Sequence, residues 1–163
     1  MIQTRPGTRS TVSLQRRAVT VALLLLCIVA TPTLAAKSKI NTTLLGNLAV
    51  DGYDPVAYFT EGAPTKGSRK FTLEWQGANW RFASQESLDA FRSEPERYAP
   101  AYGGYCAWAV SQGYTAGIDP QAWRIVDGRL FLNYNRKVQK TWEADRANLI
   151  EQADRNWPQV LEK

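Results

Sequence analysis

Cys106 is the residue of this sequence that is best suited to covalent chemistry. It follows Gly103 and Gly104 at the start of a short apolar segment that is predicted to be helical. In the first turn of a helix, unpaired backbone N–H groups and the helix dipole stabilise a thiolate. The sequence therefore predicts Cys106 as a candidate nucleophile, redox thiol or soft metal ligand. A small buried core residue remains the alternative, because free cysteine is among the most buried residue types.

Several residue types that catalysis and metal binding commonly use are missing. The 163 residues include no histidine, two cysteines and one methionine, Met1. A hydrolase triad with histidine and a zinc site with three or four Cys or His ligands are therefore excluded within one chain. Copper(I) prefers Cys and Met, so copper stays open as a cofactor only through Cys106 or a site shared by two copies. Four carboxylates could supply oxygen ligands: Asp51, Asp54, Asp119 and Asp127. Helix caps and turns are the alternative role for all four, and this is the favoured one for Asp54 and Asp127.

Aromatic residues are the other group that can form a site. They make up 11% of the chain, with six Trp and seven Tyr. Such rings can line a pocket for a planar or apolar ligand, but filling the core of a small domain is the favoured interpretation. The set considered for a pocket comprises Tyr53, Tyr58, Trp80, Tyr102, Tyr105, Trp108 and Tyr134.

The elements that must position these residues begin with a short helix and a hairpin. Asp54 and Pro55 are typical of a helix start, since Asp caps and Pro suits the first helical position. Alternating apolar residues over 70–75 and 80–83 predict two strands joined by a turn at 76–79. Ser84 is a candidate cap for a following helix, which Pro95 ends or restarts.

The second half repeats this order. A helix of about two turns is predicted from 105 to 110, and Gly113 ends it. Asp127-Gly128 between apolar runs predicts a second hairpin. Asn135 is a candidate cap for one long C-terminal helix that Pro158 ends. Paired strands without βαβ units indicate a small α+β domain with two β-hairpins, short helices and a long C-terminal helix.

The N-terminus is typical of an export signal. Arg16 and Arg17 precede an apolar run of thirteen residues, 18–30, and small residues near Ala35 and Ala36 suit cleavage. A spanning helix needs about 20 apolar residues, so a cleaved signal is favoured over a permanent anchor, and no membrane span is expected after cleavage. We therefore divide the chain into a secretory signal peptide (1–36), a flexible arm (37–47), a domain (48–158) and a tail (159–163).

Two consequences follow for localisation and partners. The protein is expected to be exported, to the periplasm or the medium, and cleavage would remove Cys27 and leave Cys106 as the single thiol. The formal charge of +5 comes mostly from four arginines in residues 1–36, so it does not indicate nucleic-acid binding. A small molecule, a thiol or a protein partner is expected instead.

The sequence resembles the exported YHS-domain proteins, including a branch described as YHS-domain selenoproteins. The resemblance covers nearly all of residues 48–158, although the chain lacks the histidine of the motif that names the wider group. It rests on segments 52–59, 80–84, 91–98, 102–107, 119–123, 130–135 and 153–157.

This resemblance implies a small α+β module of the kind attached to heavy-metal pumps and metal-dependent oxygenases. It also implies a reactive chalcogen at Cys106, since some relatives carry selenocysteine there. If the matching segments converge, then Tyr102, Tyr105, Asp54 and Tyr58 are the expected binding residues around it. Three hypotheses compete: a redox or soft-ligand thiol, a copper-handling accessory protein, and a non-catalytic interaction module.

Overall fold

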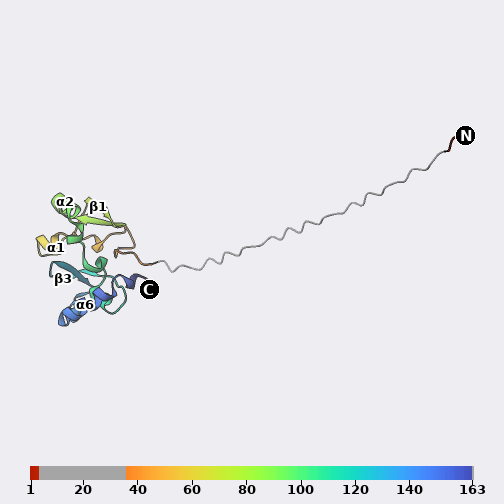
Figure 1. Ribbon diagram of the computed structural model, residues 1–163. Helices are drawn as coiled ribbons and strands as arrows, with labels where there is room; N and C mark the ends of the chain where they lie inside the picture. Colours follow the sequence, from red (N-terminus) through yellow and green to blue (C-terminus); the bar gives the residue numbers. More distant parts are fainter. Residues whose placement is uncertain (4–35, 163) are drawn as a thin grey trace. The chain divides into compact units, whose positions relative to one another are not determined.

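Two antiparallel hairpins, each followed by helices, form the domain (Figure 1). The computed structural model describes residues 1–3 and 36–162, so the predicted signal peptide lies almost entirely outside the described residues. The mixed α+β class with two hairpins is confirmed. In chain order the elements are η1 (Val50–Gly52), α1 (Ala57–Thr60), β1 (Ser68–Trp75), β2 (Ala78–Phe82), α2 (Gln85–Ser93), α3 (Pro95–Tyr98), η2 (Ala101–Gly104), α4 (Ala107–Ser111), β3 (Asp119–Val126), β4 (Arg129–Asn133), α5 (Arg136–Ala144), α6 (Arg146–Asn156) and η3 (Gln159–Glu162).

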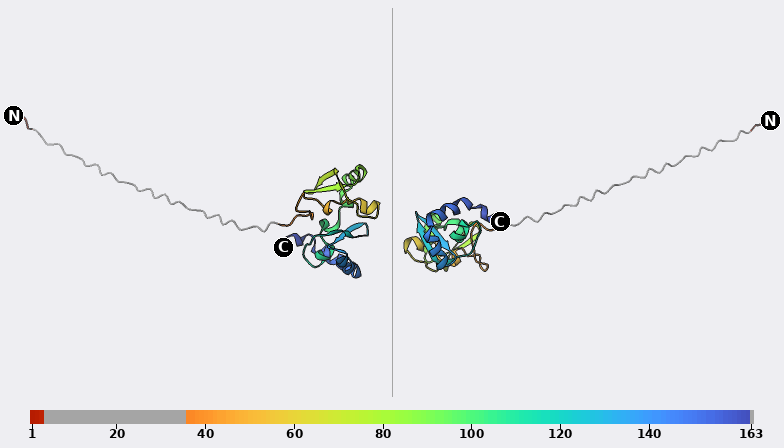
Figure 2. Two further views of the ribbon diagram at one scale, coloured as in Figure 1. Left: turned by 180° about the vertical axis from the view of Figure 1, so that it is seen from behind. Right: turned by 90° about the horizontal axis from the view of Figure 1, so that it is seen from below.

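The first hairpin supplies one of two apolar cores. Its turn residues Gln76 and Gly77 both have positive φ, 48° and 73°, which matches the right-handed twist of a tight hairpin. Trp80 and Phe82 on β2 are fully buried, and their rings lie 4.9 and 5.2 Å from the ring of Phe91 on α2. The predicted alternation therefore places one face of the hairpin against α2 (Figure 2).

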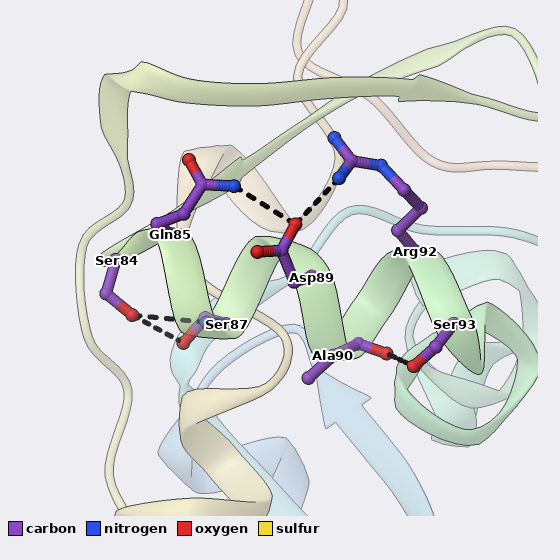
Figure 3. Close-up of polar contacts among 7 residues, drawn as sticks. All are labelled: Ser84, Gln85, Ser87, Asp89, Ala90, Arg92 and Ser93. Carbon is purple, nitrogen blue, oxygen red and sulfur yellow. Dashed lines mark hydrogen bonds and ion pairs between the residues drawn. The ribbon is translucent and has the colours of Figure 1, made fainter.

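Helix α2 begins where its cap residue predicts. The Ser84 hydroxyl oxygen accepts a hydrogen bond from the Ser87 N–H at 3.1 Å (Figure 3). On the solvent side, Asp89 accepts from Gln85 at 3.0 Å and pairs with Arg92 at 2.6 Å. Such exposed contacts one turn apart add only a few tenths of a kcal/mol, so α2 is held mainly by its buried face.

The second hairpin carries the other core. Asp127 and Gly128 form its turn with φ of 49° and 75°, as the Asp-Gly pair predicts. Phe131 on β4 is buried against the rings of Trp142 and Tyr102, with centroids 5.4 and 5.8 Å away. The second core therefore joins β4 to the C-terminal helices.

The C-terminal segment is helical as predicted, but it forms two helices and not one, because it is divided at Asp145. Asn135 caps α5 by accepting from the Val138 N–H at 2.9 Å, as predicted. Asp145 then leaves the helical region (φ −135°, ψ 37°), and its carboxylate accepts from the Asn148 side chain at 2.7 Å. Aspartate is a weak helix former because its side chain bonds locally to nearby groups. The break lets α5 pack on the second hairpin while α6 packs on α4.

Residues 37–41, which belong to the predicted arm, make specific contacts with the domain. The Lys37 N–H donates to the Leu161 carbonyl at 2.8 Å, and the Asn41 N–H donates to the Gly103 carbonyl at 2.8 Å. Asn41 also donates from its side chain to the Gly104 carbonyl at 3.1 Å, and Ile40 is buried. Gly103 permits this approach, since a Cβ there would overlap the Lys39 carbonyl oxygen.

The buried carboxylate of Asp54 joins the start of α1 to the end of β2. One oxygen accepts from the backbone N–H groups of Val56 and Ala57 at 2.8 and 3.4 Å, and the other from Ala83 at 2.8 Å. The residue is 0% exposed, so these donors have no alternative partner in water.

Asp54→Ala should therefore lower the free energy of unfolding by about 3 kcal/mol, because it orphans buried N–H groups. Guanidinium chloride titration of the variant and the unchanged chain measures this loss. Asp89→Ala is the matched control: its exposed ion pair should contribute less than about 0.5 kcal/mol. Equal losses in the two variants would contradict the bridging role.

Candidate functional site: the thiol of Cys106

Cys106 lies at the start of α4 and is paired with the second hairpin. It is the N-cap residue of α4, and its backbone forms an isolated parallel bridge with Leu132 of β4. Its N–H donates to the Ala116 carbonyl at 3.1 Å, and its carbonyl accepts from the Val110 N–H at 3.0 Å. The helix starts two residues later than predicted, so Cys106 flanks the first turn instead of lying within it.

Polar groups from β4 and its C-terminal flank surround the sulfur. The Tyr134 N–H donates to Sγ at 3.3 Å, and the thiol faces the Asn133 Oδ1 atom at 3.8 Å. The same Oδ1 accepts from the Trp108 N–H at 3.3 Å, so one amide oxygen serves both the helix start and the thiol. Asn133 is 0% exposed, and its Nδ2 has no hydrogen-bond partner within the described residues.

Burial controls the ionisation of this thiol. The residue is only 1% exposed, and burial raises the pKa of Cys106 above its ordinary value. Backbone N–H groups of Ala109, Tyr134 and Trp108 lower the pKa, but they do not outweigh the burial. The expectation of N–H groups near the sulfur is therefore right, while the expected depressed pKa is wrong. At neutral pH the side chain is a neutral thiol.

An apolar pocket of about 230 Å³ opens beside the sulfur. Tyr134 is 57% exposed and Tyr114 is 45% exposed, so these two rings extend into solvent. Cys106 is among the residues that line this pocket, although only 1% of the residue is exposed. The lining consists of one thiol and apolar or aromatic side chains: Cys106, Trp108, Ala109, Tyr114, Ala116, Tyr134 and Val138.

The four residues expected around Cys106 do not line this pocket. The Tyr102 hydroxyl donates to Asp154 at 2.8 Å, and its ring belongs to the second core. The Tyr105 hydroxyl donates to the Ser38 carbonyl at 2.9 Å. Tyr102 thus directs its side chain to α6, and Tyr105 directs its side chain to the N-terminal segment.

Asp54 and Tyr58 belong to the first hairpin's side of the domain. Asp54 is the capping carboxylate described above, and the Tyr58 hydroxyl donates to the Pro120 carbonyl at 3.0 Å. Burial is the main reason that the pKa of Tyr58 is raised, with nearby Tyr53 and Asp119 adding to it. These residues are structural in their contacts, and the resemblance alone suggested their convergence on the thiol.

The aromatic set divides between core and pocket. Trp108 and Tyr134 line the thiol pocket, whereas Trp80 and Tyr58 are buried in the first core. Sequence reasoning missed Tyr114 and Asn133. Asn133 follows three apolar residues of a predicted strand, and a polar side chain at the end of a buried strand was the available signal.

The four carboxylates considered as oxygen ligands have different surroundings in the structure. Asp51 has a raised pKa because of burial first and the charge of Asp119 second, so these two lie near each other. Asp127 belongs to the hairpin turn. Within residues 1–3 and 36–162, no group of three or more His, Cys, Asp or Glu side chains is placed to hold a metal ion.

A comparison with known protein families supports the resemblance to YHS-domain proteins. Residues 56–102 match the YHS domain. This stretch of the chain is therefore similar to the YHS domain. The match runs from the start of α1 into η2 and ends before Cys106, so the thiol pocket belongs to the part of the chain that follows it. No curated protein and no solved structure matches the chain.

The structure also bears on membrane association. Among the described residues, no helix has both the length and the apolar character needed to cross a bilayer.

We predict that Cys106 alkylates slowly in the folded protein. In a Cys27→Ser background, the reaction with iodoacetamide should accelerate with pH to a midpoint above about 8.5, because burial keeps the thiol protonated. Mass spectrometry follows the adduct, and denatured protein should react at least tenfold faster at pH 8. Cys106→Ser supplies the blank. A midpoint below the ordinary cysteine pKa, at the rate of the denatured chain, would refute this ionisation state.

Proposed function

We propose that this chain is an exported YHS-domain accessory protein whose functional group is the Cys106 thiol, acting as a redox-active or soft-ligand sulfur. The observation that carries the proposal is the position of Cys106: the residue is among those that line an apolar pocket, and its Sγ accepts the Tyr134 N–H at 3.3 Å. Export rests on the apolar N-terminal run, and the accessory role rests on the YHS domain.

The pocket favours small, uncharged reagents. Its walls are aromatic and aliphatic, so a charged reagent would lose its hydration without gaining a partner. The neutral thiol at neutral pH fits the same environment. Of the two roles, redox chemistry needs only one sulfur, whereas a resident metal centre needs several ligands that the described residues do not bring together.

A hydroperoxide is the oxidant class that meets these conditions. As the thiol loses its proton, the sulfur attacks the outer peroxide oxygen, and the O–O bond breaks. The proton goes to the departing alkoxide, so that Cys106-SH and ROOH become Cys106-SOH and ROH. Sulfur is oxidised by two electrons and the peroxide is reduced by two. The N–H groups of Tyr134 and Ala109 stabilise the negative charge that develops on sulfur.

Return to the thiol requires a reductant from outside the chain. Cys106 is the free cysteine of the described part, and Cys27 would leave with the signal peptide. A small thiol R′SH can attack the sulfenic acid, release water and form a mixed disulfide. A second R′SH then breaks that disulfide to give Cys106-SH and R′SSR′. A thiol substrate or partner is thus part of the proposal.

The test combines a neutral oxidant with a trap for sulfenic acid. The Cys27→Ser chain is treated with tert-butyl hydroperoxide and dimedone, and the adduct on Cys106 is measured by mass spectrometry. Ala116→Leu, which fills the pocket, should slow adduct formation at least fivefold, and Cys106→Ser should abolish it.

The variants also distinguish a pocket reaction from a reaction of unfolded protein. Tyr114→Ala removes a lining ring and should accelerate adduct formation. Its melting temperature should stay above the assay temperature, which shows that the acceleration does not come from unfolding. If only denaturant allows the adduct to form, or if filling the pocket has no effect, the redox role fails. Copper handling and an interaction module would then remain, and the interaction module predicts that Cys106→Ser leaves partner binding intact.

Copper handling is the second candidate function. It is favoured by the combination of a buried Cys106 thiol and backbone N–H donors beside its sulfur. Burial penalises a free thiolate, but a thiolate bound to Cu(I) has its charge neutralised, and the N–H donors still stabilise the sulfur. Cys106 would supply one ligand, and a second soft ligand must come from another molecule. Chromatography after loading with Cu(I) and a small thiol tests this, and copper retained equally by Cys106→Ser would contradict it.

A further inference from the structure

A second cavity of about 330 Å³ lies on the side of the domain that carries Trp75 and Trp157, and its lining differs from that of the thiol pocket. It is bounded by the end of β1, the connection from α3 through η2, the start of β4 and the residue that follows α6. The N-terminal segment closes part of it through Lys39 and Ile40. Its volume is in the range of small-molecule sites.

Arg129 is the most firmly held cation of this cavity. Its guanidinium makes two hydrogen bonds to Asp154, at 2.8 and 3.1 Å, and lies over the rings of Tyr102 and Phe131 at 5.5 and 4.9 Å. A guanidinium has five N–H donors, so the carboxylate leaves several of them free. The paired carboxylate and the two rings fix the orientation of the group before any ligand binds.

Two further cations line the same cavity. Arg97 pairs with Glu94 at 3.0 Å, but both side chains are more than half exposed, so this pair is weak. Lys39 has no ion-pair partner among the described residues. Glu96 is the single carboxylate in the lining, against three cations. Asp154 and Glu94 neutralise two of these cations from outside the lining, so the attraction for an anion rests on Lys39, on the free N–H donors of Arg129 and on the weakly paired Arg97.

Aromatic rings and a strained loop complete the cavity. Trp75 and Trp157 both line it and are only partly buried, so each presents ring surface. Tyr102 and Gly103 also line it, with φ of 55° and 59°, and a left-handed tyrosine is uncommon. Strained backbone persists where its surroundings hold it, and it clusters at ligand sites.

We propose that this cavity binds a small aromatic anion, a flat ring bearing a carboxylate or sulfonate. Lys39, Arg97 and Arg129 would hold the anionic group, and Trp75 and Trp157 would pack against the ring. The site is separate from the thiol pocket, with which it shares no lining residue, and does not depend on the function proposed for Cys106.

Calorimetric titration of the full chain with 2-naphthoate tests the proposal, with 2-naphthamide as the uncharged counterpart. We expect the carboxylate to bind at least tenfold more tightly than the amide, and its affinity to fall as salt is added. The double variant Lys39→Gln, Arg97→Gln should weaken binding at least tenfold. Both side chains are exposed, so the fold should be retained.

A matched control removes two charges elsewhere. Lys66→Gln with Lys70→Gln changes the net charge equally but touches no lining residue, so naphthoate affinity should stay within twofold. Equal loss in the two double variants, equal binding of naphthamide, or no binding of naphthoate at millimolar concentration would overturn the proposal. Cys106→Ser should leave the affinity for naphthoate unchanged. Loss of binding in that variant would show that naphthoate binds in the thiol pocket instead, which would also overturn the proposal.

Discussion

The backbone pairing between Cys106 and Leu132 is the constraint on which the site depends. It joins the residue before α4 to β4, across 25 intervening positions of the chain. Once this pairing is made, the next residues of β4 and its flank, Asn133 and Tyr134, necessarily lie beside the sulfur. The pocket follows from the same geometry, because α4 supplies Trp108 and Ala109 while α5 supplies Val138. The thiol is thus positioned by the second hairpin and its neighbours, and not by the YHS match that precedes it.

Two opposing electrostatic effects meet at that sulfur. Desolvation favours the neutral thiol, whereas three nearby N–H groups favour the anion, and desolvation is the larger. The outcome is a thiol that is unreactive on its own but is surrounded by donors that stabilise charge once it develops or is neutralised by a ligand. Both the proposed hydroperoxide reaction and the proposed binding of a soft metal would use this arrangement, which is why they rank above nucleophilic attack by a free thiolate.

Local signals in the sequence predicted much of the fold but only part of the site. Ser84 and Asn135 cap their helices, and Asp127-Gly128 forms its turn, because caps and tight turns depend on residues within a few positions. The break at Asp145 was missed because the apolar spacing continues through it, and only the different packing partners of α5 and α6 require it. Asn133 and Tyr114 were missed for a related reason. Asn133 reaches Cys106 only through the long-range pairing of Cys106 with Leu132, and Tyr114 only through the turn after α4 that sets its ring against Trp108.

The apolar wall around Cys106 has a consequence for its deeper oxidation. A sulfenic acid is uncharged and adds a single oxygen, whereas a sulfinic acid is ionised at neutral pH and adds two. The side chains of Trp108, Ala109 and Val138 provide no cation to pair with that charge, so it would depend on the nearby backbone N–H donors and on the unpartnered Nδ2 atom of Asn133. Overoxidation would therefore place an unpaired anion between α4 and β4 and loosen their junction. Chemical damage at one atom would be converted into local unfolding, which marks the spent molecule for proteolysis.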